Sequence, residues 1–289
     1  QTTVVFFTGI SLAEKDYRGL VIANEGANFS AGANLSMLYM FALEQEWDEI
    51  NLMIAQFQNT MMRARFSSVP VVVAPSGMAL GGGCELSLHA DRIQAHAETY
   101  IGLVEFGVGL IPAGGGTKEL TMRAADTFAS GDPEYNRLQE VFMNIATAKV
   151  ATSAQEAVDM GIISDKDGIT LNRARLIADA KQAVIELADA GYTQMPQRTD
   201  VKVLGKGAMA LFEAGITGMT YGNYISEHDA KIARKLAFVM CGGDLSYPTE
   251  VSEQYLLDLE REAFLSLTAE RKTLERIQSI LFKGKPLRN

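Results

Sequence analysis

The stretch that decides the fold covers residues 69–117 and reads VPVVVAPSGMALGGGCELSLHADRIQAHAETYIGLVEFGVGLIPAGGGT. Its apolar, β-branched start at residues 69–73 is short and lies between prolines, which predicts a buried strand. Three glycines at positions 81–83 then open the segment CELSLHA, which predicts a helix. A second apolar run, YIGLVE, ends on Glu105, and the glycine-rich GVGLIPAGGGT follows it.

The glycines at the start of this helix favour the binding of an oxygen atom that gains negative charge. They allow close approach of a ligand, and the first N–H groups of a helix lack intrahelical acceptors. The helix dipole adds partial positive charge at the same place. Glu85 lies in the first turn, and Glu105 follows twenty residues later. Two such carboxylates could activate a water and exchange a proton at a neighbouring carbon. Alternatively, Glu85 caps the helix and Glu105 is a solvated surface residue.

Three segments together resemble the crotonase (enoyl-CoA hydratase/isomerase) superfamily. They are GLVIANEGANFSAGANL at 19–35, GMALGGGCELSLHAD at 77–91 and YIGLVEFGVGLIPAGGGT at 100–117. Their order and spacing also match the family. The remainder, including FKGKPLRN at the carboxyl end, is similar to the carboxyl-terminal hydratase part of bacterial 3-hydroxyacyl-CoA dehydrogenases, the fused enzymes of fatty-acid β-oxidation.

The resemblance implies addition of water to a trans-2-enoyl-CoA, giving a 3-hydroxyacyl-CoA. The backbone N–H groups of Ala31 and Gly82 match the two halves of the family's oxyanion hole. Glu85 and Glu105 would hold the water, with Glu105 as donor of the α-proton and Glu85 as base for the attacking oxygen. The residues that the resemblance places around the substrate are Ala33, Met37, Gly81, Ile111, Pro112 and Ala113.

The expected fold class is α/β. The resemblance implies a crotonase-type core of repeated strand–strand–helix units over residues 1–170, and the helical pattern predicts an all-helical region over residues 171–289. Within the core we expect a helix at 1–17, a strand at 19–23 and helical sequence at 35–66 with a break near Trp47. The helical region is interrupted near Pro196 and at residues 242–248.

Composition excludes several classes of protein. The chain has 289 residues and a net charge of −9, which argues against a nucleic-acid surface. No apolar run approaches the roughly 20 residues that a membrane span needs. Two cysteines, Cys84 and Cys241, fit a reducing cytoplasm better than a disulfide framework. Cys84, His89 and His96 lack the spacing of a zinc site, so we expect no metal.

The chain begins at Gln1 inside a helical pattern, and the resemblance implies a strand hairpin before it. We therefore expect a fragment that has weak activity or none by itself. Coenzyme A would bind only as part of the substrate. If the chain is part of a fused 3-hydroxyacyl-CoA dehydrogenase, NAD would bind in an upstream domain. The expected partners are an acyl-CoA and, beyond it, a homo-oligomer or a thiolase-type protein.

Other residues carry two interpretations each. Lys283, Lys285 and Arg288 are either solvated surface or, as the resemblance implies, a contact for the CoA phosphates. His228 is predicted to be a cap or surface histidine. The glycines at 114–116 precede a predicted helix and could cradle a phosphate, but the sequence lacks a GxxxxGK[ST] pattern.

Three alternative functions stay open. An enoyl-CoA isomerase typically works with only the later carboxylate, so the presence of both Glu85 and Glu105 favours hydration. An acyl-CoA hydrolase of the same superfamily would release free thiol. A non-catalytic docking module of a β-oxidation complex would bind partners but would gain no heat stability from acyl-CoA.

Overall fold

The computed structural model describes residues 2–131 and 133–289, which form two compact units interleaved along the chain. The first unit comprises Gln1–Ala33, Gln56–Gly102 and Val150–Gln197, and the second comprises Asn34–Ala55, Leu103–Lys149 and Arg198–Asn289. The sequence predicted one boundary near residue 170, and that assignment of functional domains stays a prediction.

The first unit is an α/β assembly. Its helices are α1 (Thr2–Asp16), α4 (Gly82–Leu88), α7 (Ala154–Asp159), the short η2 (Arg173–Arg175) and α8 (Leu176–Asp189). Its strands are β1 (Leu20–Ala23), β2 (Val71–Ala74), β3 (Met78–Leu80), β4 (Arg92–His96), β5 (Tyr100–Gly102) and β6 (Gly168–Thr170). The long helix α3 (Trp47–Arg65) ends in this unit.

Four strands form a parallel sheet in the order β1-β2-β4-β6, with Leu20 opposite Val71 and Gln94 opposite Gly168. The strands β3 and β5 form a second parallel pair. All four residues of β2 are buried, as expected for a strand covered on both faces.

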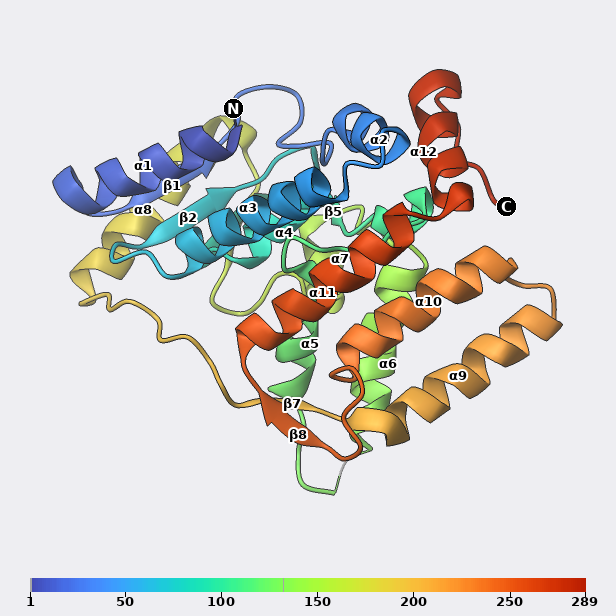
Figure 1. Ribbon diagram of the computed structural model, residues 1–289. Helices are drawn as coiled ribbons and strands as arrows, with labels where there is room; N and C mark the ends of the chain where they lie inside the picture. The colour runs from blue at the N-terminus through green and yellow to red at the C-terminus, as the bar shows by residue number, and fades with distance from the viewer. Residues whose placement is uncertain (1, 132) are drawn as a thin grey trace. The chain divides into compact units, whose positions relative to one another are not determined.

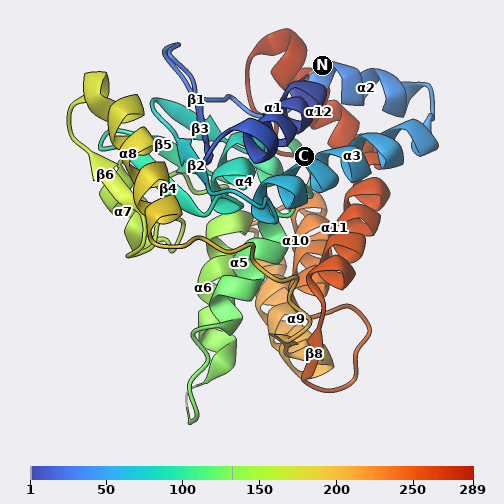
Figure 2. The same ribbon diagram turned by 90° about the vertical axis from the view of Figure 1, so that its left-hand side faces the viewer.

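Each face of β2 packs against a different set of apolar side chains. Val71 and Val73 pack with Ile10 and Leu86, which belong to α1 and α4. Val72 and Ala74 face α8, where they meet Leu176, Ala180, Ala183 and Val184. Figure 2 shows α8 beside β4 and β6. The alternation of Val71, Val72 and Val73 between two layers fixes the register, because a slip of one residue would exchange the layers.

The elements predicted around the central stretch are confirmed. The strand at 19–23 is β1, the run at 69–73 becomes β2, and the segment after the glycines is α4. The helix predicted for residues 1–17 is α1, although Gln1 lies outside the described residues. The sequence predictions did not include β3, β4 or β6, which are three to five residues long. Such short strands carry little periodic signal of their own.

The second unit is mainly helical. Its helices are α2 (Leu35–Leu43), the 3₁₀ helix η1 (Glu105–Val108), α5 (Gly116–Ala125), α6 (Glu134–Ala146), α9 (Gly205–Tyr221), α10 (Glu227–Met240), α11 (Glu253–Thr268) and α12 (Arg271–Lys283). Its strands are β7 (Val201–Val203) and β8 (Thr249–Val251). The helices α9 and α10 lie side by side (Figure 1).

Polar caps define where several of these helices begin. Asn34 accepts from the N–H groups of Ser36 and Met37 at the start of α2. Ser226 and Asp229 form a reciprocal capping box at the start of α10. The predicted break near Trp47 is confirmed, since α2 ends at Leu43 and α3 begins at Trp47.

The prediction of an entirely helical region after residue 171 is wrong in one respect. The strands β7 and β8 pair in antiparallel fashion, with Val201 opposite Val251, and Val201 and Val203 pack with Met122 and Leu256. Both strands are three residues long and about fifty residues apart in sequence. They lie near the predicted interruptions at Pro196 and at residues 242–248, so the sequence marked the breaks but not the pairing.

One helix, α6, follows α5 along the chain, and Asp132 between them lies outside the described residues. Helix α7 begins after Ser153, whose hydroxyl accepts from the N–H of Glu156, and Gly161 follows with a φ of +72°. Along the described part of the chain, every helix is too short or too polar to cross a bilayer.

Candidate active site

The loop that carries Ala31 is joined to β3 by backbone hydrogen bonds. The N–H of Ser30 donates to the Met78 carbonyl at 2.8 Å, and the N–H of Leu80 donates to the Ser30 carbonyl at 2.9 Å. These two bonds form an isolated parallel bridge between Ser30 and Ala79. Ala31 therefore follows a residue paired with β3, and Gly82 comes two residues after β3 ends. The two predicted amide donors lie on neighbouring segments of the first unit.

Each glycine of the triplet has a structural reason to be glycine. Gly81 has a φ of +54°, a conformation that L side chains rarely adopt. A Cβ on Gly82 would lie 2.8 Å from the Phe57 ring, and a Cβ on Gly83 would lie 2.6 Å from the Ser30 Cβ. The close approach of Gly83 to Ser30 holds the Ala31 loop against the start of α4. Gly82 is the first residue of α4, so its N–H has no acceptor within the helix.

Glu85 is a buried residue in the first turn of α4, with 2% of its surface exposed. Its backbone carbonyl accepts from the His89 N–H at 3.2 Å and lies 2.7 Å from His89 Nδ1. The histidine is the C-cap residue of α4. The helix dipole favours a carboxylate in the first turn, which is where Glu85 lies. The prediction of a functional role for Glu85 stays a prediction.

Glu105 belongs to the second unit and is the first residue of η1. It is partly buried, in contrast to the alternative of a fully solvated surface residue. The helix ends at Gly109, which has a φ of +90° and donates its N–H to the carbonyls of Glu105 and Phe106. This left-handed cap turns the chain after only four residues, and its hydrogen bonds fix the backbone that follows Glu105.

The predicted substrate-binding residues differ in exposure. Ile111, Pro112 and Ala113 are buried, and the Thr117 hydroxyl donates to the Pro112 carbonyl at 2.9 Å. In contrast, Met37 is 43% exposed and Ala33 is also exposed. Residues 111–113 therefore belong to an ordered interior segment of the second unit.

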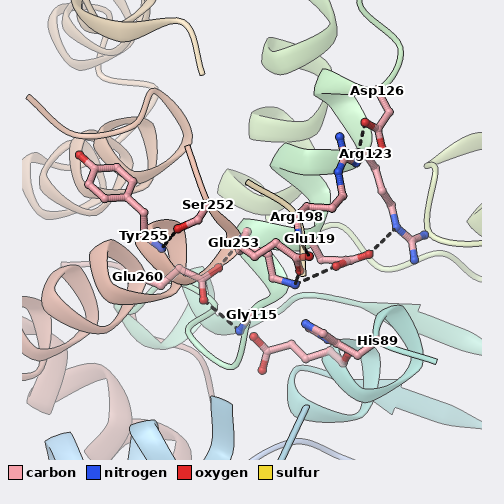
Figure 3. Close-up of polar contacts among 12 residues, drawn as sticks. His89, Gly115, Glu119, Arg123, Asp126, Arg198, Ser252, Glu253, Tyr255 and Glu260 are labelled. Carbon is pink, nitrogen blue, oxygen red and sulfur yellow. Dashed lines mark hydrogen bonds and ion pairs between the residues drawn. The ribbon is translucent and has the colours of Figure 1, made fainter. Parts of the chain in front are cut away.

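A side chain of the same unit contacts the glycine loop at 114–116. The carboxylate of Glu260 accepts from the N–H of Gly115 at 2.9 Å and from the N–H of Lys118 (Figure 3). Glu260 is itself fully buried on α11. A carboxylate of the protein therefore interacts with the N-terminus of α5, where the sequence left a phosphate cradle open.

Buried charges continue behind this loop. Lys118 is fully buried and donates to Glu119 at 2.9 Å and to Glu253 at 3.1 Å. The backbone N–H of Arg198 also donates to Glu253, and the Arg198 guanidinium pairs with Asp126 (Figure 3). These contacts tie α5 to α11. Buried charges are tolerated only when they are paired and hydrogen-bonded. The buried Lys118 therefore needs both carboxylates, and its bonds hold the loop and the two helices together.

The second unit also contains a cavity of about 650 Å³ next to η1. Its walls are mostly apolar and include Phe106, Phe142, Met143, Ala146, Ile216 and Met219. Phe106 is the immediate neighbour of Glu105. A volume of this size lies within the roughly 300–1,000 Å³ of small-molecule sites.

Two predictions about basic residues have different outcomes. His228 is not a surface residue: it is 3% exposed and lies in the first turn of α10. Burial lowers its pKa to about 4, helped by the nearby Arg276 charge. Arg288 lies 3.5 Å from Asp229, and a contact of Lys283, Lys285 and Arg288 with CoA phosphates stays a prediction.

Sequence reasoning missed Lys118, Glu260 and Thr273, which contact the segment around the predicted site only in the folded chain. A lysine in a predicted helix and a glutamate on an amphipathic helix have no local signal that distinguishes them from surface residues. The one local signal was the glycine run at 114–116 before a predicted helix. The first backbone N–H groups of that helix need acceptors from elsewhere in the chain.

Comparison with known proteins identifies the family. The family model for enoyl-CoA hydratase/isomerase matches residues 9–201. The chain belongs to the enoyl-CoA hydratase/isomerase family. Its similarity to a probable 3-hydroxyacyl-CoA dehydrogenase of Bacillus subtilis is 49% identity over 97% of this chain and 35% of that protein. A putative fatty acid oxidation complex trifunctional enzyme of Rickettsia felis is 29% identical over 94% of this chain and 34% of its own length.

The chain spans about a third of the length of these curated relatives. Among solved structures, an enoyl-CoA hydratase from Rhodobacter sphaeroides matches with a TM-score of 0.62 at 15% identity, covering 100% of this chain and 83% of that one. The predicted crotonase-type α/β fold with a helical carboxyl-terminal region is therefore confirmed, and so is the family named from the three sequence segments.

Proposed function

We propose that this member of the enoyl-CoA hydratase/isomerase family hydrates trans-2-enoyl-CoA to 3-hydroxyacyl-CoA. The observation that carries the proposal is that both acids are present in ordered positions: Glu85 is buried in the first turn of α4, and Glu105 begins η1. Hydration needs one group to activate water and one to supply the proton at the α-carbon, so two acids suit it better than one.

In this mechanism the thioester oxygen binds to the N–H groups of Ala31 and Gly82. Enolate charge accumulates on that oxygen when water attacks the β-carbon. A backbone donor of this kind is rigid and lowers the barrier by about 3 kcal/mol. The bond between Ser30 and β3 and the packing of Gly83 on Ser30 support the proposal, because both restrict the Ala31 loop.

Glu85 acts as the base for the attacking water, and Glu105 donates the proton to the α-carbon. Both acids share one water in this scheme, so their titrations are coupled and the pH profile reports the pair. The Ala113 carbonyl also orients the water. The site as proposed uses no metal and no cofactor, since coenzyme A is part of the substrate.

The cavity beside Phe106 supports binding of the acyl chain there. Its apolar wall would remove the hydrocarbon from water, while the thioester stays near Glu105. The names of the relatives, of which this chain covers about a third, further support a role in fatty-acid oxidation.

The test is a steady-state assay of the complete polypeptide with 2-enoyl-CoA substrates of graded chain length. We expect Glu105→Gln to lower kcat by about a thousandfold or more while the thermal melting temperature is unchanged, because the proton donor is lost without a change of volume. Near-normal hydration of crotonyl-CoA by this variant contradicts the proposal.

A parallel assay separates the other functions of the family. With 3-enoyl-CoA as substrate, an isomerase would retain turnover in a Glu85→Gln variant, whereas a hydratase should lose hydration in both single variants. Release of free thiol would identify a hydrolase. The absence of any heat stabilisation by acyl-CoA would favour a docking module.

A further inference from the structure

The 3₁₀ helix that begins with Glu105 is connected to two helices of the carboxyl-terminal region by a buried hydrogen-bond chain. The hydroxyl of Thr273 on α12 donates to the Gly109 carbonyl at 2.9 Å. His228 Nε2 on α10 lies 2.9 Å from the same hydroxyl oxygen. Because the single hydroxyl proton is directed to Gly109, the Nε2 atom of His228 must donate its N–H to Thr273.

The contact point is the left-handed cap of η1. Gly109 donates its own N–H to the carbonyl of Glu105, so its position is coupled directly to the backbone of the acid. A Cβ on Gly109 would lie 2.9 Å from Thr273 Oγ1 and 3.0 Å from Thr273 Cα. The backbone of η1 and the surface of α12 are therefore in direct contact, and the hydrogen bond sets their register.

The two supporting helices are themselves held together by charge. Arg276, one turn after Thr273, pairs with Asp229 at 2.8 Å, and both side chains are buried. Asp229 is the neighbour of His228 and part of the capping box of α10. Arg276 also donates to the Asn289 side chain at 2.8 Å. Thr273 and His228 are thus held in one geometry by a paired interior charge.

We propose that Thr273, supported by His228, is a positioning residue that fixes η1 and thereby the carboxylate of Glu105. The inference rests on the proposed role of Glu105 as proton donor. Thr273 contacts only the backbone of η1, so it acts through Glu105 and has no chemical step of its own. Burial lowers the pKa of His228 to about 4, so the imidazole is neutral at pH 7 and donates through one nitrogen only.

The chain supplies a matched control for the test. Thr268 on α11 is also fully buried, and its hydroxyl donates to the Phe264 carbonyl at 2.9 Å within its own helix. Thr268→Val and Thr273→Val therefore each remove one buried hydroxyl from a carbonyl of the protein. Only the second change removes a bond to the segment that carries Glu105.

In the complete polypeptide, we expect Thr273→Val to lower kcat for hydration by about tenfold with KM nearly unchanged, because a small misplacement of an acid affects the chemical step more than binding. Thr268→Val should keep kcat within about twofold even if its melting temperature falls equally. Thr273→Ser retains the hydroxyl and should restore most of kcat. Equal kcat losses in the two valine variants, or no recovery with serine, overturn the proposal.

Two further variants keep the test decisive. If Thr273→Val does not fold, His228→Leu leaves the bond from Thr273 to Gly109 but removes its support, and we expect kcat about threefold lower at unchanged KM. An unchanged kcat in that variant refutes the proposal. Glu105→Gln is measured alongside: retention of activity there means that the proposed function fails, whereas its loss together with a normal Thr273→Val variant means that only the positioning role fails.

Discussion

The two compact units are stabilised by different kinds of interior. In the first, Val71, Val72 and Val73 of β2 are fully buried between two layers of apolar side chains. The second buries Lys118 and Arg276 completely, each beside a carboxylate. The predicted amide donors belong to the first unit, and Glu105 belongs to the second.

This difference suits the two proposed tasks. Backbone amides need a fixed main chain, which a parallel sheet with tightly packed glycines provides. A side-chain acid needs its backbone held in place, and around the 105–116 segment that constraint comes from polar side chains such as Thr273 and Glu260. The second unit should therefore be more sensitive to loss of a polar group, and the first to changes of shape.

The largest expected effect is that of Lys118→Met in the second unit. The substitution removes the positive charge between Glu119 and Glu253 and leaves buried carboxylates without it, so we expect a loss of about 3–5 kcal/mol of unfolding free energy. Urea unfolding curves measure it.

The control for this variant is Lys231→Met in the same unit. Lys231 pairs with Glu270, but its side chain is 48% exposed. Its replacement should cost less than about 1 kcal/mol. Similar losses of unfolding free energy in the two variants would mean that the buried cluster stabilises the unit no more than an exposed ion pair does.

A smaller effect is expected for Gly83→Ala in the first unit. The new Cβ would lie 2.6 Å from the Ser30 Cβ and must push the Ala31 loop away from α4. We expect kcat/KM to fall by about a hundredfold, since one oxyanion donor moves out of place. Steady-state kinetics with crotonyl-CoA provide the measurement.

Gly207→Ala is the matched change in the second unit. Gly207 lies in α9, and a Cβ there meets no atom within 4 Å. This variant should keep full activity and gain up to about 1 kcal/mol of stability, because alanine favours the helix. Normal kinetics of Gly83→Ala would show that the glycine packing does not control the oxyanion loop.

The smallest effects concern the loss of stability at acidic pH. A residue of each unit contributes to this loss over a different pH range. The hydrogen bond from Arg63 lowers the pKa of Glu14 in the first unit to about 2. Its stabilisation is present above the ordinary value near 4.5 and is lost as pH falls toward 2. Burial lowers the pKa of His228 in the second unit to about 4. The unfolded chain binds this proton first, so stability falls between about pH 6.5 and pH 4.

We expect the shifted pKa of each group to change the free energy of unfolding by about 2 kcal/mol across its pH window, after allowance for solvent screening. The free energy of unfolding, measured with urea at pH 7, 5 and 3, should change less between pH 7 and 5 in His228→Gln than in the unchanged protein. In Glu14→Gln it should change less between pH 5 and 3. If both variants lose pH dependence over the same interval, the assignment of the two windows is wrong.

The sequence predicted the elements whose signal is local. The β-branched run before the glycines and the breaks near Trp47 and Pro196 act within a few residues, and the structure confirms them. The strands β7 and β8 were missed because each is stabilised by a partner about fifty residues away.

His228 illustrates the same limit within the site. Its position near a helix start predicted a cap or an exposed side chain, but it is buried and its ring contacts Thr273 on α12. Burial of a side chain depends on what packs over it, and that partner is forty-five residues away in sequence.

The sequence alone determined the family, the glycine-rich turn and the positions of the two acids, because a closely packed backbone turn requires particular residues in a short, continuous order. Only the tertiary structure decided which distant side chains hold the segment that runs from Glu105 into α5 in place. Glu260, Thr273 and Lys118 acquire their contacts when the helices pack, since an unpaired polar group costs free energy in an interior of low polarity.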